Sequence, residues 1–280
     1  MQVLQKIYPL REARAALGYQ GRVGLVPTMG ALHAGHASLA QKSVAENDHT
    51  IATVFVNPTQ FGPNEDLDRY PRTLDADLAL LEDMGVDLVF APEVKEIYDP
   101  AGTEIALTLD RLDKILCGAK RPGHFDGVMQ IVSILFNLTQ PTHGYFGEKD
   151  FQQLTILRQL VKELHFPVEI VGCPIIREED GLAMSSRNRY LTIEERSQAL
   201  FLSHCLTYIR THRDQFSRVS DIQAYIHDQL THYPLVTLDY AEVFETQGLK
   251  PLDQLADAIA PRCFIAAFLG NTRLIDNMAI

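Results

Sequence analysis

The sequence predicts an α/β protein in which a doubly wound parallel sheet is followed by a smaller α+β lid domain. Through about the first 170 residues, short apolar runs alternate with segments whose apolar residues recur at spacings of three and four. This alternation indicates βαβ units joined by right-handed crossovers, as in Rossmann-like sheets. After Pro174 the alternation stops, so we expect two domains, at 1–175 and 176–280, joined by a hinge.

The expected elements of the first domain follow from these runs. Strands are predicted at 23–26, 50–56, 86–90, 144–146 and 168–171. Helices are predicted at 37–46, 74–84, 128–138 and 150–164. In a doubly wound sheet, ligands bind at the carboxyl ends of the strands. The turns that follow these strands are therefore the places to look for a site.

The second domain is predicted from a different pattern. A polar stretch at 177–188 leads into two helical segments, at about 193–213 and 220–233. Strand-like runs follow at 237–245, 263–269 and 272–275. Helices grouped before strands are typical of an α+β arrangement.

Composition and charge exclude several classes of protein. With 46% hydrophobic and 22% charged residues, the chain is in the globular range. A net charge of −11 without a basic block argues against a nucleic-acid partner. Four scattered cysteines favour a reducing compartment without zinc. No apolar run approaches membrane-spanning length, and the first residues lack a signal-peptide pattern, so we expect a cytoplasmic protein.

The turn after the first expected strand carries His33 and His36, separated by Ala34 and Gly35. A strand, a Gly-containing turn and a helix N-terminus form an anion site, because backbone N–H groups and the helix dipole point at the turn. Two imidazoles there can donate to phosphate oxygens, and the predicted ligand is a nucleotide triphosphate. The alternative is a pair of capping or core histidines.

Four further segments carry polar groups suited to the same ligand. Gln60 offers a neutral amide after the second strand, although an ordinary Asn-Pro turn is the alternative. Arg121 and His124 form a local basic cluster, or else a solvated loop. The segments 146–153 and 184–187 combine glycine, hydroxyl and cationic groups in patterns suited to phosphate, with helix capping as the alternative. Because 184–187 lies at the expected hinge, it is a candidate lid.

These segments, in this order, resemble the pantothenate synthetase (pantoate–β-alanine ligase) family over essentially the whole chain. The motifs that carry the resemblance lie at 27–36, 57–61, 121–128, 147–153, 181–188 and in the tail at 269–277. That family belongs to the HxGH nucleotidyltransferases and class I synthetases. The resemblance implies ATP-dependent ligation of (R)-pantoate and β-alanine through a pantoyl adenylate, with release of AMP and pyrophosphate.

The resemblance also implies roles for individual residues. His36, His33 and Lys149 are the expected catalytic residues, with His36 as proton donor. Gln60 and Gln153 are expected to bind pantoate, and Gln60 and Tyr70 to bind β-alanine. The expected ATP-binding residues are Met29, Gly30, Ala31, Leu32, His33, Ala34, Gly35, His36, Gly147, Glu148, Lys149, Asp150, Ile176, Met184, Ser185, Ser186 and Arg187.

The remaining expectations concern the metal and the partners. Mg²⁺ is expected with ATP, held chiefly by phosphate oxygens, and Asp77 is the expected protein ligand. No permanent organic cofactor is implied. The expected partners are the small-molecule substrates and a second copy of the chain in a homodimer, with no nucleic acid and no membrane.

Two residues depart from the family pattern, Asp126 and Gln130. An acid at 126 weakens the basic rim or points to solvent. The rival interpretations are a nucleotidyltransferase that uses a phosphate ester and a nucleotide-binding regulatory module. The amides Gln60 and Gln153 disfavour the first, because a phosphorylated substrate needs a basic pocket. The histidine pair and the lid segment disfavour the second.

Overall fold

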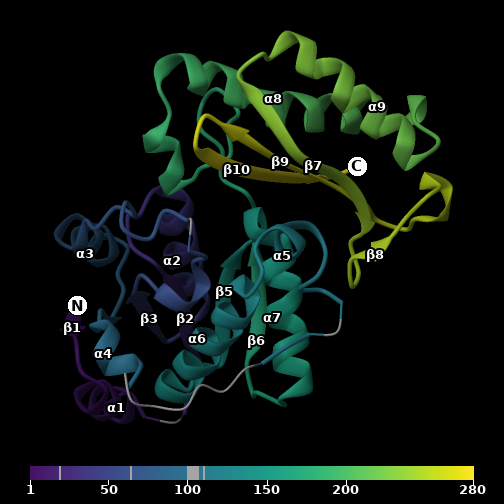
Figure 1. Cartoon of the computed structure of the whole chain (residues 1–280). Coiled ribbons are helices and arrows are strands. Elements are labelled where there is room, and N and C mark those ends of the chain that lie inside the picture. Colours follow the sequence, from purple (N-terminus) through teal and green to yellow (C-terminus); the bar gives the residue numbers. More distant parts are fainter. Residues whose placement is uncertain (19, 64, 100–106, 110) are drawn as a thin grey trace. The chain divides into compact units, whose positions relative to one another are not determined.

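A computed structural model describes residues 1–280 except 19, 64, 100–106 and 110. The chain forms two compact units (Figure 1). The first consists of Met1–Glu148 and Gln153–Pro174, and the second of Lys149–Gln152 and Ile175–Ile280. The chain therefore enters the second unit briefly at residues 149–152 before it returns to the first.

The first unit is built on a six-stranded parallel sheet in the order β1-β4-β3-β2-β5-β6. The strands are β1 (Gln2–Leu4), β2 (Val23–Thr28), β3 (His49–Val54), β4 (Leu88–Phe90), β5 (His143–Gly147) and β6 (Glu169–Cys173). The predicted doubly wound parallel sheet is thus confirmed. The strand β1 was not predicted, because three residues at a sheet edge are too few to show a periodic pattern.

Helices lie on both faces of this sheet (Figure 1). They are α1 (Ile7–Ala16), α2 (Ala34–Glu46), α3 (Leu74–Asp83), α4 (Val94–Ile97), α5 (Leu116–Lys120), α6 (His124–Thr139) and α7 (Phe151–Glu163). On one face, α2 and α3 bury Leu39 and Leu81 against Val26 and Tyr145 of the sheet. On the other, Phe136 of α6 packs against the sheet, 3.5 Å from where a Cβ at Gly144 would lie. Both faces are therefore apolar, as a parallel sheet requires.

The strand order places a topological switch point between β2 and β5. From β2 the chain runs through β3 to β4 on one side, and β5 and β6 continue on the other side. Loops leaving neighbouring strands at such a point diverge, which opens a crevice at the carboxyl edge. The turns that begin after Thr28 and Gly147 both start at this edge.

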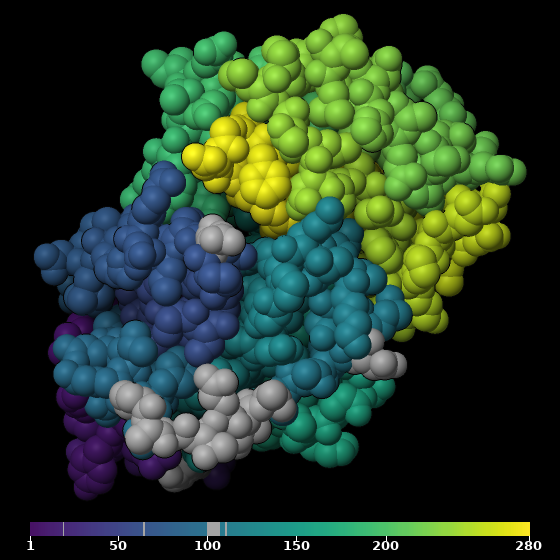
Figure 2. Space-filling view, viewed as in Figure 1, coloured from purple at the N-terminus to yellow at the C-terminus, as the bar shows by residue number. Residues whose placement is uncertain are grey.

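The second unit holds an antiparallel sheet in the order β10-β9-β7-β8. Its strands are β7 (Val236–Glu245), β8 (Lys250–Pro251), β9 (Pro261–Leu269) and β10 (Thr272–Ala279). The helices α8 (Ile193–Thr211) and α9 (Val219–Gln229) pack on it through a buried apolar cluster that includes Phe201, Leu206 and Ile265. In Figure 2, residues of α8 and α9 form the green surface of this unit, beside the yellow terminal strands.

Two further findings apply to the part of the chain that the structure describes. No helix there combines the length and the apolar character needed to cross a membrane. The four cysteines are buried, and burial raises the pKa of Cys173 to about 11 and that of Cys205 to about 12. At neutral pH these two thiols are therefore protonated and unsuited to nucleophilic chemistry.

Candidate active site

The turn that follows β2 is held by one buried carboxylate, that of Asp77 in α3. Asp77 is 2% exposed. It accepts hydrogen bonds from the backbone N–H groups of Ala31 (3.0 Å) and Leu32 (2.8 Å), and from Thr73 Oγ1 (3.1 Å). Gly30 has a φ of +82°, and a Cβ there would lie 2.9 Å from Asp77 Oδ2. The conformation and the contact together require glycine.

These hydrogen bonds give Asp77 a structural role that the sequence did not indicate. Both carboxylate oxygens are used to shape the turn that leads to the histidines. The expected role of Asp77 in binding Mg²⁺ stays a prediction. In the described part of the chain, no group of three or more His, Cys, Asp or Glu side chains could hold a metal ion.

The two histidines of the turn lie together at the N-terminus of α2. Their ring centroids are 4.1 Å apart, and the rings are tilted by 41°. His33 is the N-cap residue, and its Nδ1 accepts a hydrogen bond of 3.1 Å from the backbone N–H of Gly35. In the neutral ring, Nε2 therefore carries the proton. The capping role and the phosphate role are compatible, because they use different nitrogens of His33.

The Gln60 amide lies against Met29, which is part of the same turn. Gln60 Nε2 is 2.9 Å from Met29 Sδ, and Gln60 Oε1 accepts a hydrogen bond of 3.2 Å from Asn57 Nδ2. Asn57 is 1% exposed and also donates to the carbonyl of Gly127 at 3.1 Å. The buried Asn57 thus fixes the orientation of the Gln60 amide, a role that the sequence alone did not reveal.

Arg121 and His124, the predicted basic cluster, are hydrogen-bonded to each other and to the same loop. His124 Nδ1 is 2.8 Å from the Gln60 carbonyl, which only accepts, and Arg121 Nη1 is 2.9 Å from His124 Nε2. Because arginine only donates, His124 is the neutral Nδ1–H tautomer. Glu65 receives two hydrogen bonds of 2.6 Å from Arg121.

The electrostatics of this cluster follow from the Arg121–Glu65 pair. Burial raises the pKa of Glu65, but the hydrogen bond and charge of Arg121 outweigh it and hold the pKa below its ordinary value. Asp126 differs, since burial and the neighbouring charge of Asp113 raise its pKa. Asp126 is half-buried and lies close enough to Asp113 for the two charges to interact.

The other residues expected to bind the two smaller substrates have different surroundings. Tyr70 is 4% exposed and packs edge-on against Phe61, with ring centroids 6.0 Å apart. Gln153 lies in the first turn of α7 and is half-buried. Their expected roles in binding β-alanine and pantoate stay predictions.

The turn after β5 provides the second predicted phosphate segment. A Cβ at Gly147 would meet no heavy atom within 4 Å among the described residues, so the backbone is open to a ligand there. Glu148, Lys149 and Asp150 form the short 3-10 helix η2 (Glu148–Asp150). Lys149 Nζ lies 3.9 Å from Asp150 Oδ2. The turn therefore places the Lys149 ammonium group two residues after the accessible backbone of Gly147.

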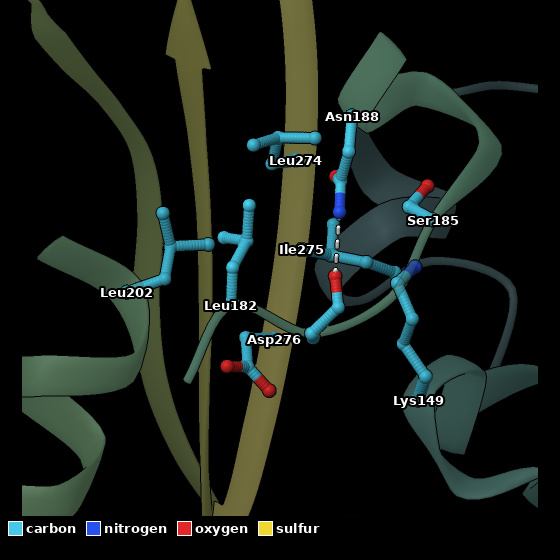
Figure 3. A pocket seen from close by; sticks show the side chains of 9 residues that line it. Lys149, Leu182, Ser185, Asn188, Leu202, Leu274, Ile275 and Asp276 are labelled. Atoms are coloured by element: carbon cyan, nitrogen blue, oxygen red, sulfur yellow. Dashed lines mark hydrogen bonds between the residues drawn. The ribbon is translucent and has the colours of Figure 1, made fainter. Parts of the chain in front are cut away.

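In the second unit, Lys149 and Ser185 line one small pocket (Figure 3). Asn188 closes another side of it and donates from Nδ2 to the carbonyl of Ala183 at 3.1 Å. Other side chains that line it are Leu182, Leu202, Leu274, Ile275 and Asp276. Two residues predicted from separate motifs to contact phosphate, Lys149 and Ser185, are thus brought together.

The segment that leads to Ser185 is a small hairpin. Met184 N donates to the Ile176 carbonyl at 3.0 Å, and Arg177 pairs with Ala183 in an antiparallel bridge. Arg177 also donates to both carboxylate oxygens of Asp276, at 2.6 and 3.0 Å. The two expected ATP-binding residues Ile176 and Met184 are therefore neighbours across the hairpin.

The tip of the hairpin is held by charged side chains. Arg196 Nη2 donates to Glu178 at 2.7 Å and to Asp180 at 2.6 Å. Glu178 also accepts a hydrogen bond of 2.6 Å from Asn188. Hydrogen bonding to Glu178 raises the pKa of Arg196 further above neutral pH. This network links the hairpin to α8, which begins five residues after Asn188.

The hydroxyl segment itself caps a short helix. Ser185 is the N-cap of the 3-10 helix η3 (Ser186–Tyr190), and its Oγ accepts a hydrogen bond of 3.3 Å from the backbone N–H of Arg187. The next helix has its own cap, because Thr192 and Glu195 form a capping box at the start of α8. Ser185 therefore caps its own short helix, and Thr192 caps the longer one.

Comparison with known proteins gives a consistent result over the whole chain. The family model for pantoate-beta-alanine ligase matches residues 2–279. A pantothenate synthetase of Bacteroides thetaiotaomicron is 49% identical over 99% of this chain and 98% of its own length. One from Moorella thermoacetica is 45% identical over 100% of this chain and 99% of its own length.

Solved structures agree with the sequences. A crystal structure of pantothenate synthetase from Thermus thermophilus has a TM-score of 0.92 and 44% identity, covering 99% of both chains. A pantoate-beta-alanine ligase from Francisella tularensis, crystallised with Beta-gamma ATP and Beta-alanine, has a TM-score of 0.83 and 36% identity. It covers 100% of this chain and 97% of that one.

Proposed function

The chain belongs to the pantoate–β-alanine ligase family, and on that basis we propose that it makes pantothenate in two steps. In the first, a carboxylate oxygen of (R)-pantoate attacks the α-phosphorus of ATP. The bond to the β-phosphate bridge breaks, and pyrophosphate leaves with that electron pair. In the second, the amine of β-alanine attacks the acyl carbon of the pantoyl adenylate, AMP leaves, and the amine loses a proton.

The paired histidines at the N-terminus of α2 are the observation that carries this proposal. Adenylation needs mainly positioning and neutralisation of growing phosphate charge. The turn after β2 holds the two imidazoles with their ring centroids 4.1 Å apart, at a helix N-terminus, which favours an anion. His33 and His36 would contact phosphate oxygens, and His36 would donate a proton to them. Lys149 would bridge the phosphate and pantoate groups, and Ser185, Ser186 and Arg187 would hold the triphosphate until pyrophosphate leaves.

The neutral amide of Gln60 suits pantoate, an uncharged polyol apart from its carboxylate. Asn57 and Met29 restrict its rotation, so it would enter the reaction preoriented. Gln153 would provide a second amide. The Francisella relative was crystallised with an ATP compound and β-alanine, which supports these as the other two substrates.

Mg²⁺ would accompany ATP, held chiefly by phosphate oxygens, because this ion commonly binds through substrate phosphates and few protein ligands. Asp77 would be its protein ligand, directly or through water. When bound, the ion neutralises phosphate charge. The homodimer and the cytoplasmic location implied by the resemblance stay predictions, and sedimentation of the purified protein tests the first.

The test is pyrophosphate–ATP isotope exchange with pantoate alone, β-alanine alone and neither. We expect exchange that requires pantoate and not β-alanine, because the adenylate forms before the amine is used. Tight ATP binding without exchange in any arm would overturn the acyl-adenylate mechanism. Exchange supported better by another acid would keep the chemistry and change the substrate.

A further inference from the structure

The tail motif at 269–277 is part of the family resemblance, but its sequence does not indicate a role. The structure does. Its strand, β10, carries the adjacent residues Asp276 and Asn277, which are 3% and 2% exposed. Each holds a different segment of the second unit. Asn277 contacts Lys149, and Asp276 contacts Arg177 at the base of the hairpin that leads to Ser185.

The Asn277 amide is fixed by two partners with opposite requirements. Its Nδ2 donates to the Lys149 carbonyl at 2.9 Å, and its Oδ1 accepts from Arg262 Nη1 at 2.6 Å. A carbonyl only accepts and a guanidinium only donates, so the amide has one satisfied orientation. Among side chains of this size and shape, only asparagine provides both a donor and an acceptor.

Neighbouring contacts hold Asn277 and its partners in place. The Arg262 guanidinium lies 4.0 Å from the centre of the Phe151 ring, two residues after Lys149. Phe151 also packs against Phe264 of β9, with ring centroids 6.1 Å apart. Asp276 Oδ1 accepts the backbone N–H of Asn277 at 2.7 Å. Residues 149–152 are therefore attached to the terminal strands by a hydrogen bond, a cation–π contact and a ring contact.

We propose that Asn277 is a positioning residue for Lys149, a role that rests on the proposed function of that lysine. A lysine side chain is flexible, so the reach of its Nζ depends on where its backbone is held. Asn277 holds that backbone through the carbonyl. A misplacement of about 1 Å by a remote change can reduce a rate roughly 10²-fold.

The decisive variant is Asn277→Asp. Aspartate has the same shape and keeps the acceptor for Arg262. It replaces the N–H donor that faces the Lys149 carbonyl with a second acceptor oxygen. We expect the rate of pantoate-dependent pyrophosphate–ATP exchange to fall by about 10- to 100-fold. Asp239→Asn is the matched control, since it weakens a partly buried pair with Arg273 (2.8 Å) in the same sheet without touching residue 149. It should leave the exchange rate unchanged.

Coupling to the lysine separates positioning from a general loss of structure. ATP affinity is measured by calorimetry for Lys149→Ala, Asn277→Asp and the double variant, because this readout needs no turnover. If Asn277 acts through Lys149, N277D weakens binding in the wild-type background and adds nothing to K149A. An equal further loss in K149A, or an N277D exchange rate like that of D239N, would overturn the inference. Undiminished binding and exchange in K149A would instead overturn the proposed role of the lysine itself.

Discussion

The turn after β2 and the tip of the hairpin before Ser185, which belong to segments expected to bind phosphate, are held by different forces. In the turn, backbone N–H groups donate to a carboxylate, Asp77, that is 2% exposed. In the hairpin, Arg196 joins Glu178 and Asp180, and all three side chains are 27 to 34% exposed. The first arrangement is shielded from solvent, and the second is open to salt.

This difference indicates a division of roles between the segments. Hydrogen bonds that are buried in a low dielectric hold a fixed geometry, which suits residues that stabilise a transition state. Exposed ion pairs contribute little energy and are screened by salt, so a segment held by them changes conformation at low cost. We therefore expect changes near the turn to affect chemistry and changes at the hairpin tip to affect stability only slightly.

His36→Ala should have the largest effect. Removing one preorganised donor should reduce the adenylation rate about 10²- to 10³-fold. The exchange assay measures the loss, and circular dichroism checks the fold. Turnover near the wild-type rate would show that His36 has only a structural role in the first turn of α2, and that the shielded turn is a structural feature alone.

Asp77→Asn should come next. The amide places an N–H against a backbone N–H, so one buried donor loses its acceptor, at a cost of about 1–3 kcal/mol in unfolding free energy. Urea unfolding measures this, and the exchange rate should fall with it. Excess Mg²⁺ should not restore the exchange rate. If excess Mg²⁺ restored the exchange rate and the unfolding free energy were unchanged, the main role of Asp77 would be to bind the metal and not to hold the turn.

Arg196→Gln should have a small effect, about 0–1 kcal/mol in unfolding free energy, because its partners are partly exposed. The difference from the wild type should shrink as salt is raised, since screening already weakens the pair. Urea unfolding at low and high salt provides the measurement. A loss of several kcal/mol in unfolding free energy that did not depend on salt would contradict the proposed difference between the hairpin tip and the turn after β2.

Glu65→Gln tests the ion pair in the first unit through the pH dependence of stability. The folded-state pKa of Glu65 lies below its ordinary value of 4.5. The stability it contributes is therefore present above pH 4.5 and is lost as the pH falls through the lowered pKa. Thermal melts below pH 4.5 should show a shallower decline for E65Q. A steeper decline would mean that this carboxyl is protonated more easily in the folded state.

The sequence predicted the parts of the fold whose signals are local. Alternating apolar runs located five of the six parallel strands, and the motif containing His33 and His36 pointed to the helix N-terminus where the rings meet. Helix α2 begins three residues earlier than predicted, because His33 acts as its cap. Strand β6 lies at Glu169–Cys173 rather than 168–171, a shift typical of boundary prediction.

The contacts that orient the site were not predictable, because they join residues far apart in the sequence. Glu65 lies 56 residues from Arg121, and no local pattern marks it as a partner. Asn57 resembled an ordinary turn residue until burial showed that it orients Gln60. The role of Asp77 depends on how α3 packs against the turn that follows β2. Such pairings depend on tertiary structure and leave no periodic signal.

The hydrogen bond between Asn277 and the Lys149 carbonyl also sets an order of events during synthesis. The two residues are 128 positions apart, so the lysine emerges from the ribosome long before its partner. At about 5–20 residues per second, the interval is roughly 6 to 26 seconds. The parallel sheet can form in that time, but residues 149–152 remain without their final anchor. In a nascent chain halted before residue 277, the hydrogen bond that holds the Lys149 backbone cannot form.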